Sequence, residues 1–565
     1  MLGRHPILAA CAGSAVLWTA LFLFLGPRYA TNDDALLAML PAGTGFAPAP
    51  DEHLIFTNVA IGLALKRLHA AVPGLPWYGL YLLAAHVVAQ TALLHAALRV
   101  QPRRARLALY LAYFAVAAAP LANNLHFTTT AFVVAQSGVL LALSLLERPP
   151  ARGRPAVAQG LAAAALVVLG GLIRFEALAL VLVLAAPVAA VLAWRRDRRA
   201  LRVPAAVLGA ALAVTLAARA FDHAYYAREA DWAAYREWSG VLREFVDFER
   251  GARYTPETAA AFHAAGLSRN DHRLLWHWFH PDADVFGADR LRAALALTPA
   301  AQPRPGERLR DRLLRIARNR TAPPMLLALP VAVLAAGASR RSRWATVAAV
   351  AASVAVLLYL AVFRKAPPHV FLPALAWPLA VPLVVEGSRF ASRAGRVALV
   401  VAGALAAGAA ARAVVFQRAE RVEKSARDDA FRRALEPLGA APERHYVLWG
   451  TFPYGVIRPL SAPGTQPGFR FFPLGWPQRT PTAQRALAAA GLPDLVRALG
   501  DPRVRLLAPP EAAPWVEQYA RQHRGLSLVL VQEASVPGFG VFRGTLAPSG
   551  AAGDRVLRSE PAGPE

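Results

Sequence analysis

The chain contains 565 residues, of which 56% are hydrophobic, and it carries a formal net charge of +26. Soluble domains contain about 45–50% apolar residues. Here the excess lies in long runs with almost no charge, which excludes a soluble globular protein. The positive charge does not indicate nucleic-acid binding, because much of it lies in short arginine clusters between the apolar runs, where such clusters orient a membrane protein. The one cysteine, Cys11, excludes a disulfide within the chain.

The first apolar run begins after Arg4 and His5 and extends to Gly26. A signal peptide has a shorter apolar region followed by a small-residue cleavage site, and the sequence at 27–29 is a poor one. We therefore expect an uncleaved first span with its N-terminus inside.

The apolar runs predict about eleven membrane spans, most of them near the roughly 17–25 residues that cross a bilayer. The arginine clusters between alternate spans then lie on the side of the N-terminus, as the positive-inside rule requires. A chain that starts inside and crosses an odd number of times ends outside. The predicted fold class is therefore mainly α: a polytopic transmembrane helix bundle (N-in/C-out) with an outward helical loop and a small C-terminal α/β domain. The predicted spans are 7–26, 77–98, 107–122, 128–146, 157–173, 177–194, 203–221, 322–338, 345–363, 370–386 and 397–415.

The segment 54–70 decides the number of spans. Its apolar part ends at Lys66 and Arg67 and is too short for a span, so it suits a helix lying along the membrane surface. If it did cross, the cluster at 99–106 would lie outside and every later loop would invert. We therefore place 54–70 on the outer surface of the membrane.

Five regions follow from this topology. Helical stretches and short strand-like runs alternate in the C-terminal part, which is typical of a small α/β domain. The regions are an N-terminal transmembrane module (1–221) with a first outward loop (27–76), an outward soluble loop domain (222–321), C-terminal transmembrane helices (322–415), an outward α/β domain (416–550) and a disordered tail (551–565).

The candidate catalytic residues are Asp33 and Asp34, in the first outward loop just after the first span. Two adjacent carboxylates near a membrane surface repel each other, so we expect the pKa of at least one to rise. An alternative interpretation is that Asn32 or Asp33 caps a helix at 35–40. Both interpretations can hold, since a cap fixes one carboxylate and leaves the other available.

Asp51, Glu52 and His53 end the same loop and are candidate substrate-binding residues. They can cap the helix at 54–70 with acids in its first turn. Alternatively, they converge with the first acidic pair and bind a divalent cation or a polar substrate. The stretch at 43–50 suits a mobile loop that closes over a ligand. No residue is assigned as a metal ligand.

Two further charged pairs are candidate substrate-binding residues. Arg174 and Glu176 lie between two apolar runs, where ions indicate function by default, although a plain ion pair is the alternative. Arg364 and Lys365 occupy an outward turn against the orientation rule, and a basic pair there suits a lipid phosphate. The alternative for this second pair is attraction to ordinary anionic headgroups.

In its arrangement the chain resembles the GT-C class of integral membrane glycosyltransferases. The shared features are a first span, an outward loop that opens with Asp33 and Asp34, a helix along the membrane, many further spans and an outward C-terminal domain. Over most of its length the chain also resembles a group of uncharacterised bacterial multi-span membrane proteins. The matching stretches are 32–34 with 51–53, 125–128, 171–174, 266–271 and 489–495.

The GT-C resemblance implies a function. Such enzymes take a sugar from a polyprenyl-phosphate carrier in the outer leaflet. This chain would then transfer a sugar to an envelope acceptor at the outer face of the bacterial cytoplasmic (inner) membrane, with its soluble parts on the periplasmic or extracellular side. Asp33 or Asp34 would be the general base, and Arg364 with Lys365, together with Arg174, would hold the phosphate.

The implied partners are membrane lipid, a lipid-linked sugar donor and a glycan or protein acceptor, without nucleic acid. No cofactor is assigned, and a divalent cation is compatible with the acidic residues. A transferase should place Asp33, Asp34, Glu52 and Arg364 around one cavity.

Two other functions are open. A transporter or flippase of lipid-linked glycans predicts polar residues spread through several spans, whereas most spans here are Ala, Leu and Val. A non-catalytic envelope protein that binds a glycan or a partner predicts that the acidic pairs only cap helices.

Overall fold

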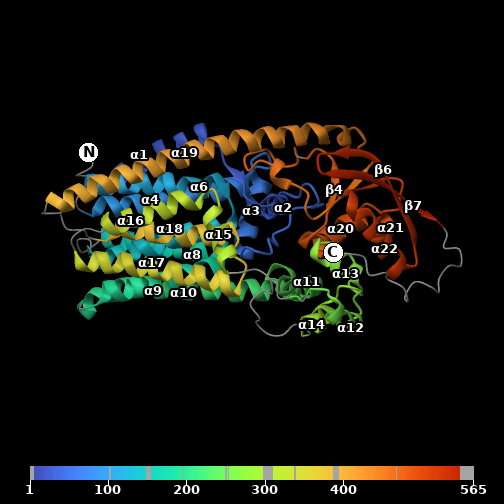
Figure 1. Cartoon of the computed structure of the whole chain (residues 1–565), viewed down its shortest axis with the longest axis horizontal. Helices are drawn as coiled ribbons and strands as arrows, with labels where there is room; N and C mark the ends of the chain where they lie inside the picture. The colour runs from blue at the N-terminus through green and yellow to red at the C-terminus, as the bar shows by residue number, and fades with distance from the viewer. Residues whose placement is uncertain are drawn as a thin grey trace.

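The computed structural model describes residues 6–100, 103–147, 154–194, 196–248, 251, 253–296, 309–335, 339–385, 393–465 and 467–547. The predicted tail at 551–565 lies outside these ranges. Long helices form a bundle at one end of the molecule, and short helices and a sheet form the other end (Figure 1). The chain is therefore a multi-pass membrane protein with a hydrophilic part at one end of its bundle.

Eight helical segments of the described residues are long and apolar enough to cross a membrane. Shorter apolar helices are α16 (Ala322–Ala335) and α18 (Pro368–Val384), where spans were also predicted. The eight are α1 (Pro6–Phe24), α4 (Trp77–Arg99), the run of α5 (Arg103–Tyr113), η1 (Phe114–Ala118) and α6 (Ala119–Asn123), then α7 (Phe127–Glu147), α8 (Arg154–Ile173), α9 (Phe175–Ala193), α10 (Arg198–Tyr226) and α17 (Arg340–Phe363).

Helix α7 lies at the centre of the bundle, because nearly every one of its residues is buried. It packs against α4, α8, α9, α10 and α18. A helix that is apolar all round is buried on all sides. The outer helices α1, α10 and α17 leave most of their apolar residues exposed, as helices in contact with lipid do.

Helix α19 (Arg393–Leu435) runs along the bundle and continues over part of the hydrophilic end (Figure 1). Its first half contains the predicted span 397–415, and its second half is charged and continues into the hydrophilic end. Pairs such as Glu420 with Lys424, 2.6 Å apart, support an exposed helix. The helix therefore passes without a break through residue 416, where the C-terminal domain was predicted to begin.

The hydrophilic end contains short helices from two separate parts of the chain. The first loop forms α2 (Asn32–Ala42) and α3 (Val59–Ala71), so the helix predicted at 54–70 begins five residues late. The long loop between α10 and α16 forms α11 (Ala230–Leu242), η2 (Arg243–Asp247), α12 (Pro256–Ala264), α13 (Arg269–Trp276), α14 (Ala288–Ala296) and α15 (Leu309–Arg318).

The predicted small C-terminal α/β domain is confirmed. Its five-stranded sheet has the order β4-β3-β5-β7-β6, with β3 parallel to β4 and β5, and β7 antiparallel to β5 and β6. The strands are β3 (His445–Leu448), β4 (Arg470–Pro473), β5 (Val504–Ala508), β6 (Ser527–Val536) and β7 (Phe539–Ala547). The helices are α20 (Pro481–Ala489), α21 (Leu495–Ala498) and α22 (Ala513–Arg524), with short turns η3 (Glu436–Ala440), η4 (Tyr454–Val456), η5 (Trp476–Arg479) and η6 (Pro510–Ala512).

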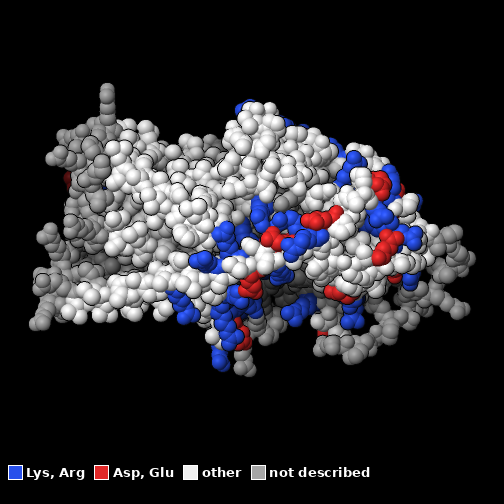
Figure 2. All heavy atoms as spheres, turned by 90° about the horizontal axis from the view of Figure 1, so that it is seen from above, with Lys and Arg blue, Asp and Glu red and all other residues white. Residues whose placement is uncertain are grey.

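The three regions predicted to share one side of the membrane meet at one end of the bundle. Strand β1 (Arg28–Tyr29) pairs with β2 (Asn124–Leu125), joining the first loop to the turn before α7. Asp282 of the long loop accepts a hydrogen bond from Tyr519 of α22 (2.7 Å). In Figure 2, charged side chains gather over one half of the molecule, and the described atoms of the other half are almost all uncharged.

Candidate active site

The acidic pair lies in the first turn of α2, and neither acid caps the helix. Thr31 occupies the N-cap position, so the cap interpretation of Asn32 or Asp33 is wrong. The Asn32 side chain instead donates to the carbonyl of Phe452 (2.8 Å) and accepts from the amide of Tyr454 (3.1 Å). These two bonds fix the start of α2 against the C-terminal domain, which leaves the carboxylates for other contacts.

Asp34 is fully buried and holds α2 against the bundle. One carboxylate oxygen accepts from the Tyr78 hydroxyl (3.0 Å) of α4 and from the amide of Phe127 (3.0 Å) at the start of α7. Burial raises the pKa of Asp34 well above its usual value, although these hydrogen bonds oppose the shift. Asp34 therefore joins three elements of the fold.

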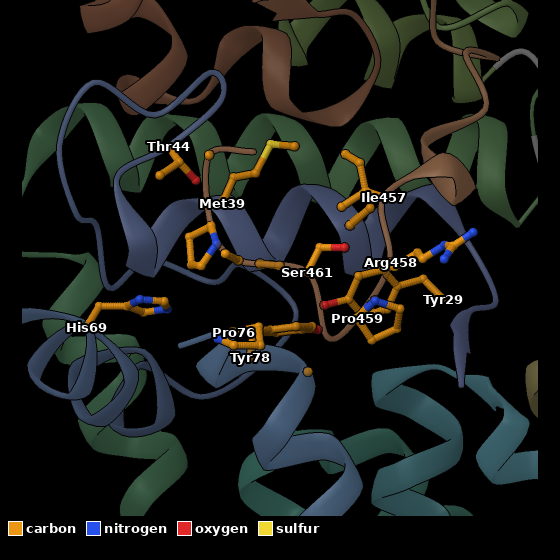
Figure 3. Close-up of a pocket in the computed structure, with 16 residues that line it drawn as sticks. Tyr29, Met39, Thr44, His69, Pro76, Tyr78, Ile457, Arg458, Pro459 and Ser461 are labelled. Atoms are coloured by element: carbon orange, nitrogen blue, oxygen red, sulfur yellow. The ribbon is translucent and has the colours of Figure 1, made fainter. Parts of the chain in front are cut away.

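A small cavity lies beside Tyr78, the residue that donates to Asp34 (Figure 3). Its volume is about 40 Å³, and its lining includes Tyr29, Met39, Tyr78 and Ser461. A space of this size holds water rather than a sugar. The carbonyl of Pro459 lies against Gly79, where any side chain would collide with it, so this loop of the C-terminal domain seats directly on α4.

Asp33 turns to a different side of α2. The indole nitrogen of Trp476 donates to its carboxylate (3.0 Å). Burial raises the pKa of Asp33 to about 6, and the Trp476 hydrogen bond and the charge of Arg174 oppose the shift. A carboxylate with a pKa near neutrality is suited to general base catalysis.

Arg174 lies in the turn between α8 and α9, within electrostatic reach of Asp33. Its Nε pairs with Glu176 (3.0 Å), and a terminal nitrogen donates to the carbonyl of Phe56 (3.2 Å). The guanidinium also lies 5.6 Å and 5.5 Å from the centres of the stacked Phe56 and Phe127 rings. These contacts hold the guanidinium in one orientation, and Glu176, which is largely exposed, acts by positioning it.

His126 adds a fixed hydrogen-bond donor to this region. The amide of Thr128 donates to Nδ1 of His126 (3.0 Å), so the proton of the neutral ring lies on Nε2. Burial lowers the pKa of His126 well below its usual value, and the charges of His369 and Arg174 add to the shift. The ring stacks on His369 with 4.1 Å between centres. Nε2 is buried without a hydrogen-bond partner among the described residues.

The basic pair at 364–365 divides between two surroundings. Burial raises the pKa of Asp247 of η2. The positive charges of Lys365 and Arg174 oppose this shift. Both residues of the pair are exposed, but Arg364 lies beside Tyr359 (3.5 Å) and over the ring of Phe248 (5.7 Å). Only Lys365 therefore belongs to the group around Arg174. We call this group the Asp33 cluster: Asp33, His126, Arg174, Asp247, Lys365 and His369.

Asp51, Glu52 and His53 form a second group and do not cap α3, whose N-cap is Asn58. The Asp51 carboxylate accepts hydrogen bonds from Nδ1 of His53 (2.7 Å), from the Thr482 hydroxyl and from Arg485 (3.0 Å). Burial opposes ionisation of Asp51, but the hydrogen bonds from His53 and Thr482 outweigh it and lower the pKa to about 2. Asp51 thus joins the first loop to α20.

Glu52 is held in the same group by Lys66 (2.6 Å) and the Tyr225 hydroxyl (2.7 Å). The carbonyl of Glu52 lies where a side chain at position 62 would begin, so Gly62 allows α3 to approach it. A cavity of about 270 Å³ opens beside this group. We call it the His53 cavity; it is lined among others by Glu52, His53, Lys66, Glu229 and Arg485.

The expectation that Asp33, Asp34, Glu52 and Arg364 line one cavity is therefore wrong, since the four lie in different surroundings and only Asp33 of them lies near Arg174. Their sequence spacing does not reveal this, because adjacent residues of a helix such as Asp33 and Asp34 point in directions about 100° apart. The segment 54–58 connects the Asp33 cluster to the His53 cavity, and Ile55 in it has a positive φ of 61°. This conformation is strained for a β-branched residue and is typical of functional segments.

Several residues of the Asp33 cluster were not among the predicted site residues. No role was predicted for His126, Asp247 or His369. Trp476 comes from the far C-terminal domain. A positional signal was available for His126 and His369, which lie at the predicted outward ends of α7 and α18, but not for Asp247 or Trp476, which are distant in sequence from any apolar helix.

Two solved structures are similar to this chain over most of its length: ArnT from Cupriavidus metallidurans bound to undecaprenyl phosphate, and the same protein in the apo state. The identities are 16% and 15%, the TM-scores are 0.41 and 0.42, and each comparison covers 95% of this chain and 97% of that chain. ArnT is a GT-C glycosyltransferase, the class that the sequence resembles. No family model matches the chain, and no curated protein matches it. At these TM-scores no residue role is carried over from ArnT.

Proposed function

We propose that this protein is a membrane glycosyltransferase that moves a sugar from a polyprenyl-phosphate carrier to an envelope acceptor at the outer face of the cytoplasmic membrane. One observation carries the proposal. A half-buried carboxylate with a pKa of about 6, Asp33, lies within electrostatic reach of the oriented guanidinium of Arg174, where the helix bundle meets the hydrophilic end. A base beside an anion-binding group is what transfer from a phosphate carrier requires.

In the proposed reaction, Asp33 accepts the proton of an acceptor hydroxyl as the oxygen attacks the anomeric carbon of the donor sugar. A carbon–oxygen bond forms there, and the bond between the anomeric carbon and the phosphate oxygen breaks. The electron pair leaves with the phosphate, so polyprenyl phosphate is the product. Such a leaving group needs stabilisation of its charge more than it needs a strong acid.

Three groups are suited to the phosphate. Arg174 offers a planar guanidinium held by Glu176 and Phe56, and Lys365 adds a second positive charge from the turn between α17 and α18. His126 offers a neutral N–H whose buried nitrogen has no partner among the described residues. Leaving such a donor unsatisfied costs about 1–3 kcal/mol, which a bound phosphate oxygen would recover.

The proposed outer location rests on the positive-inside rule. At the bundle end away from the Asp33 cluster, Glu147 of α7 pairs with Arg196 (3.4 Å) and lies 3.8 Å from Arg341. These arginines belong to short loops rich in basic residues, which remain in the cytoplasm. The opposite end, with Asp33 and the C-terminal domain, then faces outward.

The buried polar residues of α4 and α7 favour a second candidate function, movement of the lipid-linked glycan through the bundle. His86, Gln90, Thr130 and Gln136 are all buried there. However, His86 bonds to Thr130 (3.1 Å) and Gln136 donates to Tyr113 (3.0 Å), so these contacts explain the residues as helix–helix links. The transferase is therefore the preferred function.

The adjacent pair Arg364 and Lys365 provides a matched test. In membranes supplied with a panel of radiolabelled polyprenyl-phosphate sugars, Lys365→Ala should raise KM for the active donor about tenfold or more, because it removes a positive charge from the phosphate site. Arg364→Ala removes the same charge one residue away and should leave transfer near the wild-type rate.

Equal effects of the two variants would contradict the phosphate role of Lys365. Absence of transfer by the wild type from every carrier in the panel would contradict the proposed function itself. Transport of a labelled glycolipid across proteoliposomes, without any transfer, would favour the second candidate function.

A further inference from the structure

The His53 cavity lies outside the Asp33 cluster, and the proposed reaction does not use it. Its volume of about 270 Å³ accommodates a hydrated ion or a small molecule. The lining includes charges of both signs. Lys66 pairs with Glu52 and Arg485 pairs with Asp51, so these four charges are balanced in pairs. The remaining polar groups that face each other in the lining are His53 and Glu229.

The imidazole of His53 is held rigidly. It stacks on Trp232, with 4.3 Å between ring centres and 18° between planes, and the edge of Tyr226 contacts it at 4.8 Å. Its Nδ1 lies 2.7 Å from the Asp51 carboxylate, to which it donates a hydrogen bond. The ring is therefore fixed in position, and its tautomer leaves the lone pair on Nε2.

Nε2 of His53 has no hydrogen-bond partner among the described residues, although the side chain is only 4% exposed. It faces the carboxylate of Glu229 at 3.9 Å, which is too long for a hydrogen bond. One oxygen of Asp51, one of Glu52 and a ring nitrogen of His53 also lie within 4.8 Å of one another. A buried nitrogen without a hydrogen-bond partner among the described residues thus lies 3.9 Å from a carboxylate.

We propose that Nε2 of His53 and the carboxylate of Glu229 bind a divalent first-row transition-metal ion such as Zn²⁺, with water and an oxygen of Glu52 completing its coordination. An imidazole that donates its other N–H to a carboxylate is the usual form of a histidine metal ligand. Two ligands at about 2.0–2.2 Å from a tetrahedral ion lie roughly 3.4 Å apart. The half-exposed Glu229 need move only slightly to reach this spacing.

The ligand set distinguishes this ion from Mg²⁺. Imidazole favours Zn²⁺ and related transition metals, whereas Mg²⁺ prefers an octahedron of oxygens. The two cations of the lining do not oppose the site, because Lys66 and Arg485 each neutralise a carboxylate of the same group. The bound ion would join α11, through Glu229, to the loop of His53 and so close one side of the cavity.

Titration of metal into the purified, metal-stripped full-length protein tests the site without lipid or sugar, so its outcome is independent of the transferase proposal. Isothermal titration with ZnCl₂ should give one saturable site, and MgCl₂ should give none. Glu229→Gln should weaken Zn²⁺ binding at least tenfold. Because Glu229 is half exposed, this variant is expected to fold normally.

Glu237→Gln is the matched control, since Glu237 lies on the same helix and is 59% exposed, and it should bind Zn²⁺ as the wild type does. His53→Ala should abolish the site. The Co²⁺-loaded wild type should show the visible absorption of a nitrogen- and oxygen-ligated ion, and Glu229→Gln should change it. Absence of saturable Zn²⁺ binding, equal binding of Mg²⁺, or an unchanged affinity in Glu229→Gln would each overturn the proposal.

Discussion

Asp33 and Asp34 are neighbours in the chain, but their side chains have different partners. Asp34 is enclosed by Tyr78 and the amide of Phe127, which hold it as part of the packing between α2, α4 and α7. Asp33 has one strong hydrogen bond, from Trp476, and lies in the field of Arg174. Asp33 is therefore suited to chemistry and Asp34 to stability.

The pH dependence of transfer should report Asp33. Because burial raises its pKa to about 6, kcat/KM should fall about tenfold per pH unit below 6 as the base becomes protonated. The effect on stability has the opposite sign. The pKa of Asp33 is higher in the folded than in the unfolded state. Asp33 therefore contributes about 3 kcal/mol to the stability of the fold below about pH 4, and this contribution is lost as the pH rises through 6. A flat rate profile between about pH 5 and 7 would contradict the assignment.

At the residue scale, the sequence predicted the rise of a pKa within the acidic pair, although burial rather than repulsion is its largest cause; the site roles of the first-loop acids and Arg174 stay predictions. It could not choose between Asp33 and Asp34, because the choice depends on Tyr78 and Trp476, which are distant in the chain. It also treated Arg364 and Lys365 as one unit. An extended turn directs adjacent side chains apart, and only contacts such as Arg364 over Phe248 show which residue faces the cluster.

The connection between the first loop and α20 is the main contact at the scale of elements. Asp51 accepts hydrogen bonds from His53 of its own loop and from Thr482 and Arg485 of α20. A buried carboxylate with several charge-assisted bonds contributes more than a neutral hydrogen bond. This contact fixes the loop that carries Ile55 and Phe56, and hence the position of Arg174.

Asp51→Asn should lower the stability of the purified protein by about 2 kcal/mol, because it removes the charge that Arg485 and His53 pair with. Thermal unfolding in detergent measures this as a lower transition temperature. Asp289→Asn is the control, since that carboxylate is 97% exposed and should have almost no effect. Equal transition temperatures for both variants would show that the contact does not hold the loop.

The elements of the C-terminal domain were predictable from local pattern, since alternating apolar runs and turn residues mark β3, β5, β6 and β7. The start of α3 was not predictable from local pattern. Asn58 is the N-cap, and Asp51 and Glu52, the predicted caps, are bound to other residues. The continuous α19 was also missed. A change from apolar to charged sequence marks the exit from a membrane, and it does not by itself end a helix.

On the scale of the whole molecule, one end of the bundle gathers every long hydrophilic segment. The contacts of Asn32 with Phe452 and of Trp476 with Asp33 bring together residues separated by more than four hundred positions. The predicted spans placed these hydrophilic segments on one side of the membrane. In the structure the segments lie at one end of the bundle, as that prediction requires. The arginine distribution then predicts which side of the membrane this is.

Cysteine labelling tests that orientation. In a Cys11→Ser background, a membrane-impermeant maleimide applied to intact spheroplasts should label Glu511→Cys, which lies exposed in the C-terminal domain. It should not label Arg199→Cys, exposed at the other end of the bundle, until the membrane is permeabilised. The reverse pattern would place the Asp33 cluster in the cytoplasm.

The most direct test of the central claim is sugar transfer by Asp33→Asn in membranes supplied with the donor that the wild type uses. The variant should lose transfer by a factor on the order of 10²–10⁴, with unchanged expression and unfolding temperature, because the hydroxyl loses its base. Asp231→Asn, an exposed acid in the first turn of α11, should transfer normally. Transfer by Asp33→Asn at the wild-type rate would contradict the assignment of the Asp33 cluster as the active site.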